Sequence, residues 1–445
     1  MIRRTVERVV AFEAGEFAPA VLSALYFYCL LFGYFMLRPL RDTMGLEGGV
    51  DSLRLLFLGT LAVMILANLA FAAVASRVAR RVFVPLVYGF GVACLLCFLV
   101  AFLMLGPGGS EVVGRVFYVW LSVFNLMATA VFWGFMADIF TREQGKRLFG
   151  FIAVGGTAGA ISGSAWTAGF AKALGDVGLF AGASALILAA GVLAVVLDRV
   201  ASRRSMGSSD RALADGPSLG GTSWQGVIAV IRSPYLLAIA ATVGLFAIAS
   251  TLLYFEKNRI IEAYTGDAAV RTQLFAVIEL GGQILTILLQ VFITGRLMRR
   301  VGVGWLLAIV PAVTIAGFVA LALAPFVLVV GMFEGVRRAS HYALSKPARE
   351  TLFTVVPRAD KYKAKGLIDT FVYRGGDSVG ALADMALAGI GLVAAWLAVP
   401  VGAASLGIAI WLGRQESSTT VQHLPIEDLP TPGSGPLASP ASPQP

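Results

Sequence analysis

The chain has 445 residues, of which 58% are hydrophobic and 14% are charged, and its mean hydropathy is +0.82. Soluble domains carry about 25% charged residues, so this composition excludes a soluble globular protein. The net charge of +9 is compatible with a nucleic-acid partner, but the basic residues gather between apolar blocks. That distribution indicates membrane orientation and no nucleic-acid partner.

Apolar blocks long enough to cross a bilayer, which takes about 20 helical residues, recur along the whole chain. A helix satisfies its own backbone groups where no water is available, so each block is predicted to be helical. The predicted spans are 18–37, 53–76, 82–105, 116–138, 149–171, 179–198, 234–256, 273–294, 303–322, 324–340, 366–388 and 391–412. The sequence therefore predicts an all-α integral membrane protein with twelve transmembrane helices.

The basic residues orient these spans. If the N-terminus is cytoplasmic, 26 Lys and Arg residues face the cytoplasm and 8 lie on the outer side, with Arg374 inside a span. The positive-inside rule then predicts that both termini are cytoplasmic. We expect a multi-pass protein of the bacterial inner membrane.

Residues outside the spans define the remaining segments. Residues 1–17 mix Arg, Glu and Val and are predicted to form a cytoplasmic surface helix. The polar, basic loop 199–233 divides an N-terminal half, 18–198, from a C-terminal half, 234–413. Residues 414–445 are rich in Ser, Thr and Pro and are predicted to be a disordered cytoplasmic tail.

The first predicted span ends in a charged stretch, Leu37-Arg38-Pro39-Leu40-Arg41-Asp42. Pro39 can end the helix there, and Asp42 can pair with either arginine. As membrane anchors, Arg38 and Arg41 would lie on the wrong side for the positive-inside rule. This weakens the anchoring explanation without removing it, and a role in substrate binding stays open beside it.

The loop after the second span contains Arg77, Arg80 and Arg81. It resembles a degenerate signature of the major facilitator superfamily, in which Gly, Asp, Arg, Gly and two basic residues occupy this loop. Ser76 stands in place of the signature's Asp and Ala79 in place of its Gly. The resemblance implies a major facilitator-like fold and a gating role for the three arginines, although orientation by positive charge explains them equally well.

The segment after the fourth span reads FWGFMADIFTREQGKRLFG, from Phe132 to Gly150. Its FWGF and Lys146-Arg147-Leu-Phe pattern resembles the ATP/ADP translocases of plastids and obligate intracellular bacteria. The stretch from Leu37 to Asp42 resembles the same family, and Arg41 stands where that family has a functionally important lysine. The resemblance covers about residues 25–165. It implies exchange of nucleotides, with structural or gating roles for Asp42, Asp138, Lys146 and Arg147.

Glycine recurs every fourth residue in the fifth span, at Gly155, Gly159 and Gly163. This spacing predicts close packing of another helix against the glycine face. It is not a phosphate-binding loop, because no strand precedes it and no Lys-Ser/Thr pair follows it.

The two halves repeat at an offset of 219 residues. Arg77, Arg80 and Arg81 align with Arg296, Arg299 and Arg300, and Arg38 aligns with Lys257. Such matches at equivalent loops indicate duplication, hence two pseudo-symmetric six-helix halves with a substrate site between them near mid-membrane.

Several ionisable residues fall inside or beside the apolar spans of the second half, where burial of a charge costs a few kcal/mol or more. Glu279 lies mid-span, and Arg374 and Asp377 lie three residues apart on one helical face, with Asp384 seven residues further on. Arg374 and Asp377 could form a structural ion pair or leave one charge free for substrate. The substrate-binding candidates are Arg38, Arg41, Lys257, Glu279, Arg374 and Asp377.

The sequence offers little support for an enzyme or a bound cofactor. The three cysteines all fall in apolar blocks and the two histidines, His341 and His423, lie apart from them, so no metal site or nucleophile–base pair is predicted. We expect a monomer in the lipid bilayer that binds a small-molecule substrate.

Three functions remain open. The favoured one is a secondary transporter of an anionic, nucleotide-like metabolite that works by alternating access. The second is a proton-coupled carrier of another metabolite or drug, in which Glu279 or Asp377 would take the proton. The third is a non-transporting sensor or scaffold that uses the basic loops and the tail to bind a partner.

Overall fold

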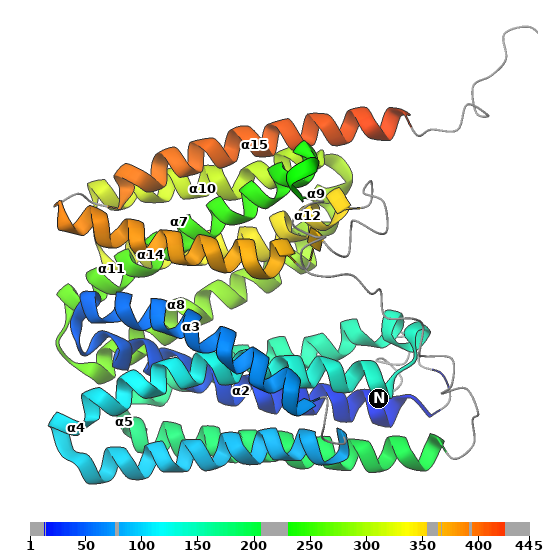
Figure 1. Cartoon of the computed structure of the whole chain (residues 1–445), viewed down its shortest axis with the longest axis vertical. Helices are drawn as coiled ribbons and strands as arrows, with labels where there is room; N and C mark the ends of the chain where they lie inside the picture. The colour runs from blue at the N-terminus through cyan, green and yellow to red at the C-terminus, as the bar shows by residue number, and fades with distance from the viewer. Residues whose placement is uncertain are drawn as a thin grey trace, which may run out of the picture.

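The computed structural model describes residues 13, 15–75, 80–205, 230–353, 364–365, 367–390 and 394–422. Regular structure in these residues is entirely helical (Figure 1). The helices are α2 (Phe17–Leu46), α3 (Gly49–Ala75), α4 (Arg80–Ile139), α5 (Arg142–Ser205), α7 (Pro234–Tyr264), α8 (Ala268–Leu289), α9 (Gly295–Arg300), α10 (Val303–Leu323), α11 (Val327–Ser340), α12 (Lys346–Leu352), α14 (Tyr373–Gly389) and α15 (Ala395–Gln422). Three wider π-helical turns continue these helices, namely η2 (Gln290–Thr294), η3 (His341–Ser345) and η5 (Ile368–Val372).

Most of this helical structure can cross a membrane. Among the described residues, nine helical segments are long and apolar enough to do so, and every predicted span overlaps a described helix. Two helices carry two predicted spans each. α5 turns at Gly175, whose φ of +58° is a left-handed conformation that glycine adopts readily. The ribbon of α4 also doubles back near its middle (Figure 1).

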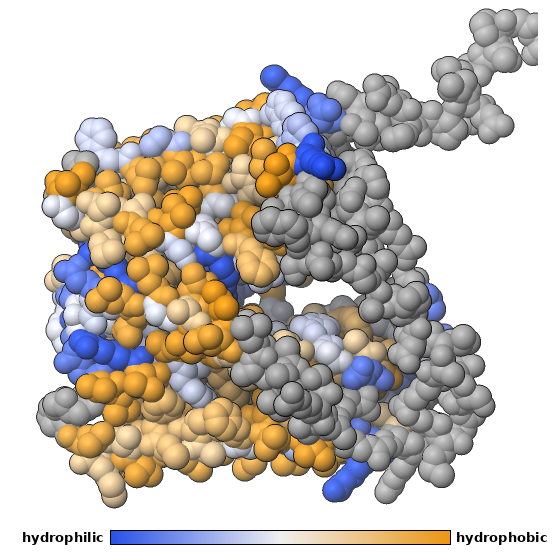
Figure 2. Space-filling model, in the orientation of Figure 1, coloured by the Kyte–Doolittle hydropathy of each residue, from blue (hydrophilic) through white to orange (hydrophobic). Residues whose placement is uncertain are grey.

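The helices form two bundles. The first bundle, α2 to α5, shares a core that includes Tyr26, Phe117, Phe132 and Phe180. The second bundle, α7 to α15, has two cores, one around Ile239 and Phe353 and another around Phe318 and Val330. Large apolar side chains such as Met104, Leu323 and Trp396 remain exposed on the outside, where lipid would cover them (Figure 2).

The bundles meet at one end and part at the other. At the closed end, where α2 ends and α8 begins, one apolar cluster combines Leu46, Leu53 and Tyr118 of the first bundle with Phe255 and Phe275 of the second. At the open end, where α2 begins and α12 lies, the bundles diverge and leave a hollow between them (Figures 1 and 2).

The predicted glycine packing in α5 is confirmed, and its partner is α2. A Cβ at Gly155 would lie 2.3 Å from the carbonyl oxygen of Ala24, and one at Gly159 would lie 2.2 Å from that of Tyr28. At Gly163 the corresponding atom is the carbonyl oxygen of Phe32, at 2.6 Å. Only glycine lets the two backbones approach this closely.

Two predicted helix ends are wrong. Pro39 does not end the first helix, because α2 continues to Leu46 and buries Leu40, Met44 and Leu46 beyond the proline. Packing of this last part outweighs the hydrogen bond that proline cannot donate. Likewise α7 continues past residue 256 to Tyr264, so Lys257 lies inside a helix and not at its end.

Helices also extend into segments predicted to be loop or tail. α5 continues to Ser205, inside the predicted loop 199–233, and α15 continues to Gln422, inside the predicted tail. Extending an existing helix costs little, so polar residues can follow the apolar span without ending it. The remainder of that loop from residue 206 to 229, the tail beyond 422, and the predicted surface helix up to residue 12 lie outside the described residues.

The α2–α5 contact leads to a stability prediction. Gly159→Ala should destabilise the protein by about 1–3 kcal/mol, because the added methyl group cannot fit against the Tyr28 carbonyl without moving a backbone. Thermal unfolding of the purified protein measures this. The matched control is Gly169→Ala in the same helix, where a Cβ would meet nothing within 4 Å. Equal melting temperatures for the two variants would contradict the close contact.

Candidate functional site

A cavity of about 810 Å³ lies between the two bundles. Side chains of α2, α3, α4 and α5 line it from one side, and side chains of α7, α8, α11, η3 and α14 line it from the other. It opens into the hollow seen between the bundles in Figure 2. The size suits a small organic ligand, since such sites measure about 300–1,000 Å³.

The cavity wall carries a net positive charge. Seven basic side chains line it, and three acidic ones do, namely Arg38, Arg41, Lys257, Arg337, Arg338, Lys346 and Arg374 with Glu279, Glu334 and Asp377. Asp42, which lies behind Arg41, balances one further charge. The remaining excess of positive charge favours an anion as ligand.

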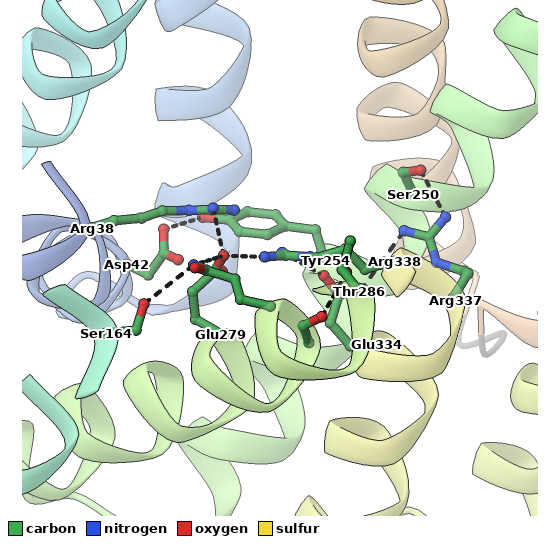
Figure 3. A network of polar contacts seen from close by, with 12 residues as sticks. Arg38, Asp42, Ser164, Ser250, Tyr254, Glu279, Thr286, Glu334, Arg337 and Arg338 are labelled. Atoms are coloured by element: carbon green, nitrogen blue, oxygen red, sulfur yellow. Dashed lines mark hydrogen bonds and ion pairs between the residues drawn. The ribbon is translucent and has the colours of Figure 1, made fainter. Parts of the chain in front are cut away.

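Glu279 is the centre of the polar network in this wall (Figure 3). Its Oε1 accepts a hydrogen bond from Nη1 of Arg38, at 3.0 Å, and further hydrogen bonds from Arg338 and from Gln283. Arg38 belongs to the first bundle, whereas the other three residues belong to the second. The Arg38–Glu279 pair therefore joins the bundles across the cavity.

Arg338 extends the network to a second carboxylate. Its Nη2 donates to Oε1 of Glu334 at 2.8 Å, one helical turn earlier in α11. The neighbouring Arg337 donates to the hydroxyl of Ser250 at 2.9 Å and lies over the ring of Phe246, which stacks on His341. Arg337 and Arg338 lie in the last turn of α11, and His341 begins the π-helical turn η3. Wider turns of this kind are frequent at functional sites.

Arg41 is held more firmly than Arg38. Its Nε and Nη2 both donate to Oδ1 of the adjacent Asp42, and its Nη1 donates to Ser122 at 3.1 Å. Asp42 also accepts a hydrogen bond from the Tyr254 hydroxyl, at 3.2 Å, which comes from the second bundle. Arg41 lines the cavity, but most of its donors are already used inside the wall.

Lys257 and Arg374 are two cavity cations that keep donors available for a ligand. Lys257 is buried between the rings of Tyr254 and Phe275, and its ammonium donates no hydrogen bond to any residue that the structure describes. Arg374, with 39% of its side chain exposed, makes one 3.3 Å contact with Asp377. Asp377 also accepts a hydrogen bond from Thr251.

The cavity brings together all six predicted substrate-binding residues, Arg38, Arg41, Lys257, Glu279, Arg374 and Asp377. The sequence analysis did not single out Glu334, Arg337 and Arg338, although all three lie within the predicted span 324–340. The two arginines, near the cytoplasmic end of that span, were counted with the cytoplasmic charges. Arg374 contacts Asp377 at 3.3 Å, whereas Asp384 pairs with Arg54. A role of either charge in substrate binding stays a prediction.

The predicted gating residues outside α2 and the glycine face have mixed placements. Arg147 pairs with Glu13 and Glu16 at the open end, at 2.9 and 3.0 Å, and Asp138 is exposed. Arg77 lies outside the described residues, and of Arg80, Arg81 and Lys146 the structure describes only the helical backbone. Within the described residues, no three His, Cys, Asp or Glu side chains are grouped so as to hold a metal.

The network predicts a difference between two arginines. Arg338→Met should destabilise the protein by about 3–5 kcal/mol, because it leaves Glu279 and Glu334 short of a buried partner. Arg374→Met should cost less than about 1 kcal/mol, since that side chain is partly solvated and makes one long contact. Chemical or thermal unfolding in detergent measures both. A larger loss for Arg374→Met would contradict this description of the network.

Comparison with known proteins bears on the fold. No protein-family profile matches the sequence, and no curated protein sequence is significantly similar to it. The structure is similar to that of a mutant of the nucleoside transporter NupG, with a TM-score of 0.58 and 13% identity over 89% of this chain and 98% of that one.

Two other solved structures show the same similarity. One is a bacterial homologue of the human lysosomal transporter Spinster, solved inward-facing and unoccupied, with a TM-score of 0.52 and 14% identity over 92% of this chain and 95% of that one. The other is the POT family transporter PepTSo, with a TM-score of 0.61 and 14% identity over 91% and 99%. The chain thus has an all-α, multi-pass membrane fold of the major facilitator-like type.

Proposed function

We propose that this protein is a secondary active transporter that works by alternating access and carries an anionic, nucleotide-like metabolite. The observation that carries the proposal is the positively charged cavity between two bundles that are closed against each other at one end only. A ligand held there would contact both bundles, so its binding could influence how they move relative to each other.

Two likenesses support a nucleotide-like substrate. The segments Leu37–Asp42 and Phe132–Gly150 resemble the ATP/ADP translocases, and the fold is shared with a nucleoside transporter. The cavity offers both parts of such a ligand a partner. Lys257 and Arg374 could bind phosphate oxygens, and the aromatic rings of Tyr34, Phe57 and Tyr373 also line the wall, where a base could stack.

The orientation of the cavity follows from the charges of the loops. If both termini are cytoplasmic, as the positive-inside rule predicts, the open end faces the cytoplasm and the closed end faces outward. We accordingly place the protein in the bacterial inner membrane with the segment boundaries given by the sequence, the loop 199–233 being cytoplasmic. The conformation described would then be the one that exchanges ligand with the cell interior.

The pairing of Arg38 favours exchange over one-way transport. Glu279 is the only carboxylate that forms an ion pair with Arg38 among the described residues, and it belongs to the other bundle. When the bundles separate around it, Glu279 keeps Arg338, but Arg38 would be left without a carboxylate. The Arg38 side chain is only 25% exposed, so leaving it without a carboxylate is costly, and an anionic ligand that takes the place of Glu279 would make the change easier. The empty carrier would reorient slowly.

The direct test is uptake into vesicles that contain the purified protein. Labelled ATP and ADP should enter vesicles loaded with nucleotide much faster than empty ones, because each reorientation requires a bound anion. Lys257→Met should raise the substrate concentration for half-maximal uptake by about tenfold or more, since a charged hydrogen bond contributes about 1.5–3 kcal/mol. Correctly folded protein that takes up no member of a nucleotide panel would refute the nucleotide substrate.

Arg38 provides a sharper test of exchange. In Arg38→Gln the neutral side chain no longer needs a carboxylate, so the empty carrier should reorient more easily. We expect the ratio of uptake into loaded vesicles over uptake into empty vesicles to fall toward one. Arg374→Gln is the control, because Arg374 and its partner Asp377 lie in the same bundle. An unchanged ratio in Arg38→Gln would exclude this explanation of exchange.

Asp377 favours the second candidate, a proton-coupled carrier of another metabolite. Whereas Glu279 accepts hydrogen bonds from two arginines, Asp377 has one long arginine contact and faces the cavity. It is therefore the carboxylate that could most easily accept a proton. A proton-coupled carrier should respond to an imposed pH gradient in empty vesicles and lose that response in Asp377→Asn. Uptake that depends on internal nucleotide and ignores the gradient would exclude this candidate.

A further inference from the structure

A buried ion network joins the bundles at the closed end, away from the cavity. Asp384 of α14 is fully buried, and its Oδ2 accepts a hydrogen bond of 2.7 Å from Nε of Arg54 in α3. Nη2 of Arg259 in α7 donates to both oxygens of Asp384, at 2.5 and 2.6 Å. Arg54, which is 4% exposed, belongs to the first bundle, whereas Asp384 and Arg259 belong to the second.

Each side of this link keeps a partner in its own bundle. Nη1 of Arg54 forms a hydrogen bond with Asp51, three residues earlier in α3, whose side chain is 92% exposed. Asp384 keeps Arg259, which also pairs with Glu256 at 2.7 Å. If the bundles separated here, neither Arg54 nor Asp384 would lose its last oppositely charged partner.

We propose that Arg54 acts as an exchangeable latch, shared by Asp384 and Asp51 in the closed state and bound by Asp51 alone when this end opens. The inference rests on the proposed alternating opening, but it does not depend on the substrate. The exposed carboxylate of Asp51 thereby gains a role that its surface position would not suggest. It receives the arginine as the buried pair breaks, so that opening leaves no unpaired charge.

The sign of the Asp51 contribution can be derived. In the closed state its negative charge lies near that of Asp384, because both bind one guanidinium, and the two repel each other. In the open state it is the sole carboxylate on Arg54 and can use all of that residue's donors. Removing the charge of Asp51 therefore favours the closed state, whereas removing the charge of Arg54 favours the open one.

A reporter for opening is available at the same end. The hydroxyls of Thr43 in α2 and Thr272 in α8 share a 2.8 Å hydrogen bond across the bundles, and both residues are buried. Thr272→Cys, in a background that carries Cys29→Ser, Cys94→Ser and Cys97→Ser, would react with a polar maleimide only when the closed end opens. The rate of labelling of the purified protein then measures opening without any substrate.

In this background Asp51→Asn should slow the labelling about two- to fivefold, the range expected for an exposed ion pair. Arg54→Gln should accelerate it, and adding Asp51→Asn to Arg54→Gln should change nothing further, because Asp51 acts through Arg54. The matched control is Glu111→Gln, which removes another partly exposed acid that pairs with an arginine of its own helix, Arg115. It should label at the parent rate.

The outcomes separate the two proposals. Labelling of Asp51→Asn at the parent rate or faster would overturn the latch, and because that side chain is exposed the variant should fold. Labelling changes as predicted, in a protein that transports no nucleotide, would support the latch and refute the substrate. Absence of labelling in every variant, Arg54→Gln included, would overturn both the latch and alternating opening.

Discussion

The ion pair between Arg38 and Glu279 is the contact on which the arrangement of the cavity depends. It joins one charge of the first bundle to one charge of the second, at 3.0 Å, in the polar wall of a cavity between largely apolar helices. A charge in such surroundings must keep a partner, and this one keeps its partner only while the bundles hold their present positions. Movement of the bundles and occupation of the cavity by an anion are thereby linked through one guanidinium.

The two ion pairs between the bundles, Arg54–Asp384 and Arg38–Glu279, differ in whether each residue keeps an oppositely charged partner when the bundles separate. Arg54 and Asp384 each have a second partner in their own bundle, so parting costs little unpaired charge. Glu279 also has one, Arg338, but Arg38 has no carboxylate partner of its own bundle among the described residues. Separation at the closed end therefore leaves no charge unpaired, whereas separation at the cavity leaves Arg38 without a carboxylate. The proposed exchange of anions would use both properties.

Hydropathy and spacing were sufficient to predict the helices, the glycine contact of α5 and six of the ionisable residues that line the cavity. Each of these can be recognised from local sequence. A membrane span is apolar, closely packed helices have small residues at their contact, and a charged residue inside a span is costly and therefore indicates a function. The partners could not be predicted. Glu279 and its partner Arg38 are 241 residues apart in the sequence, and Asp384 and its partner Arg54 are 330 residues apart.

The sequence also did not predict correctly where residues near the ends of the spans lie. Arg337 and Arg338 lie near the cytoplasmic end of the predicted span 324–340, where basic residues usually face water, so they were counted as cytoplasmic charges. In the structure they belong to α11 and line the cavity, because the bundles diverge there and leave a polar space beside the helix. The prediction that Pro39 ends the first helix was wrong for a related reason. Packing around the end of α2, which no local pattern reports, keeps the helix intact.

The predicted internal repeat places unlike side chains at equivalent positions of the cavity. Arg38 and Lys257 occupy equivalent positions at the offset of 219 residues, and both line the cavity. The residue equivalent to Glu279 in the first bundle is Thr60, which also lines the cavity but carries no charge. Glu279 bonds Arg38, whereas the ammonium of Lys257 lies between aromatic rings. On the proposed function, an anionic ligand would give Lys257 a hydrogen-bonding partner of opposite charge.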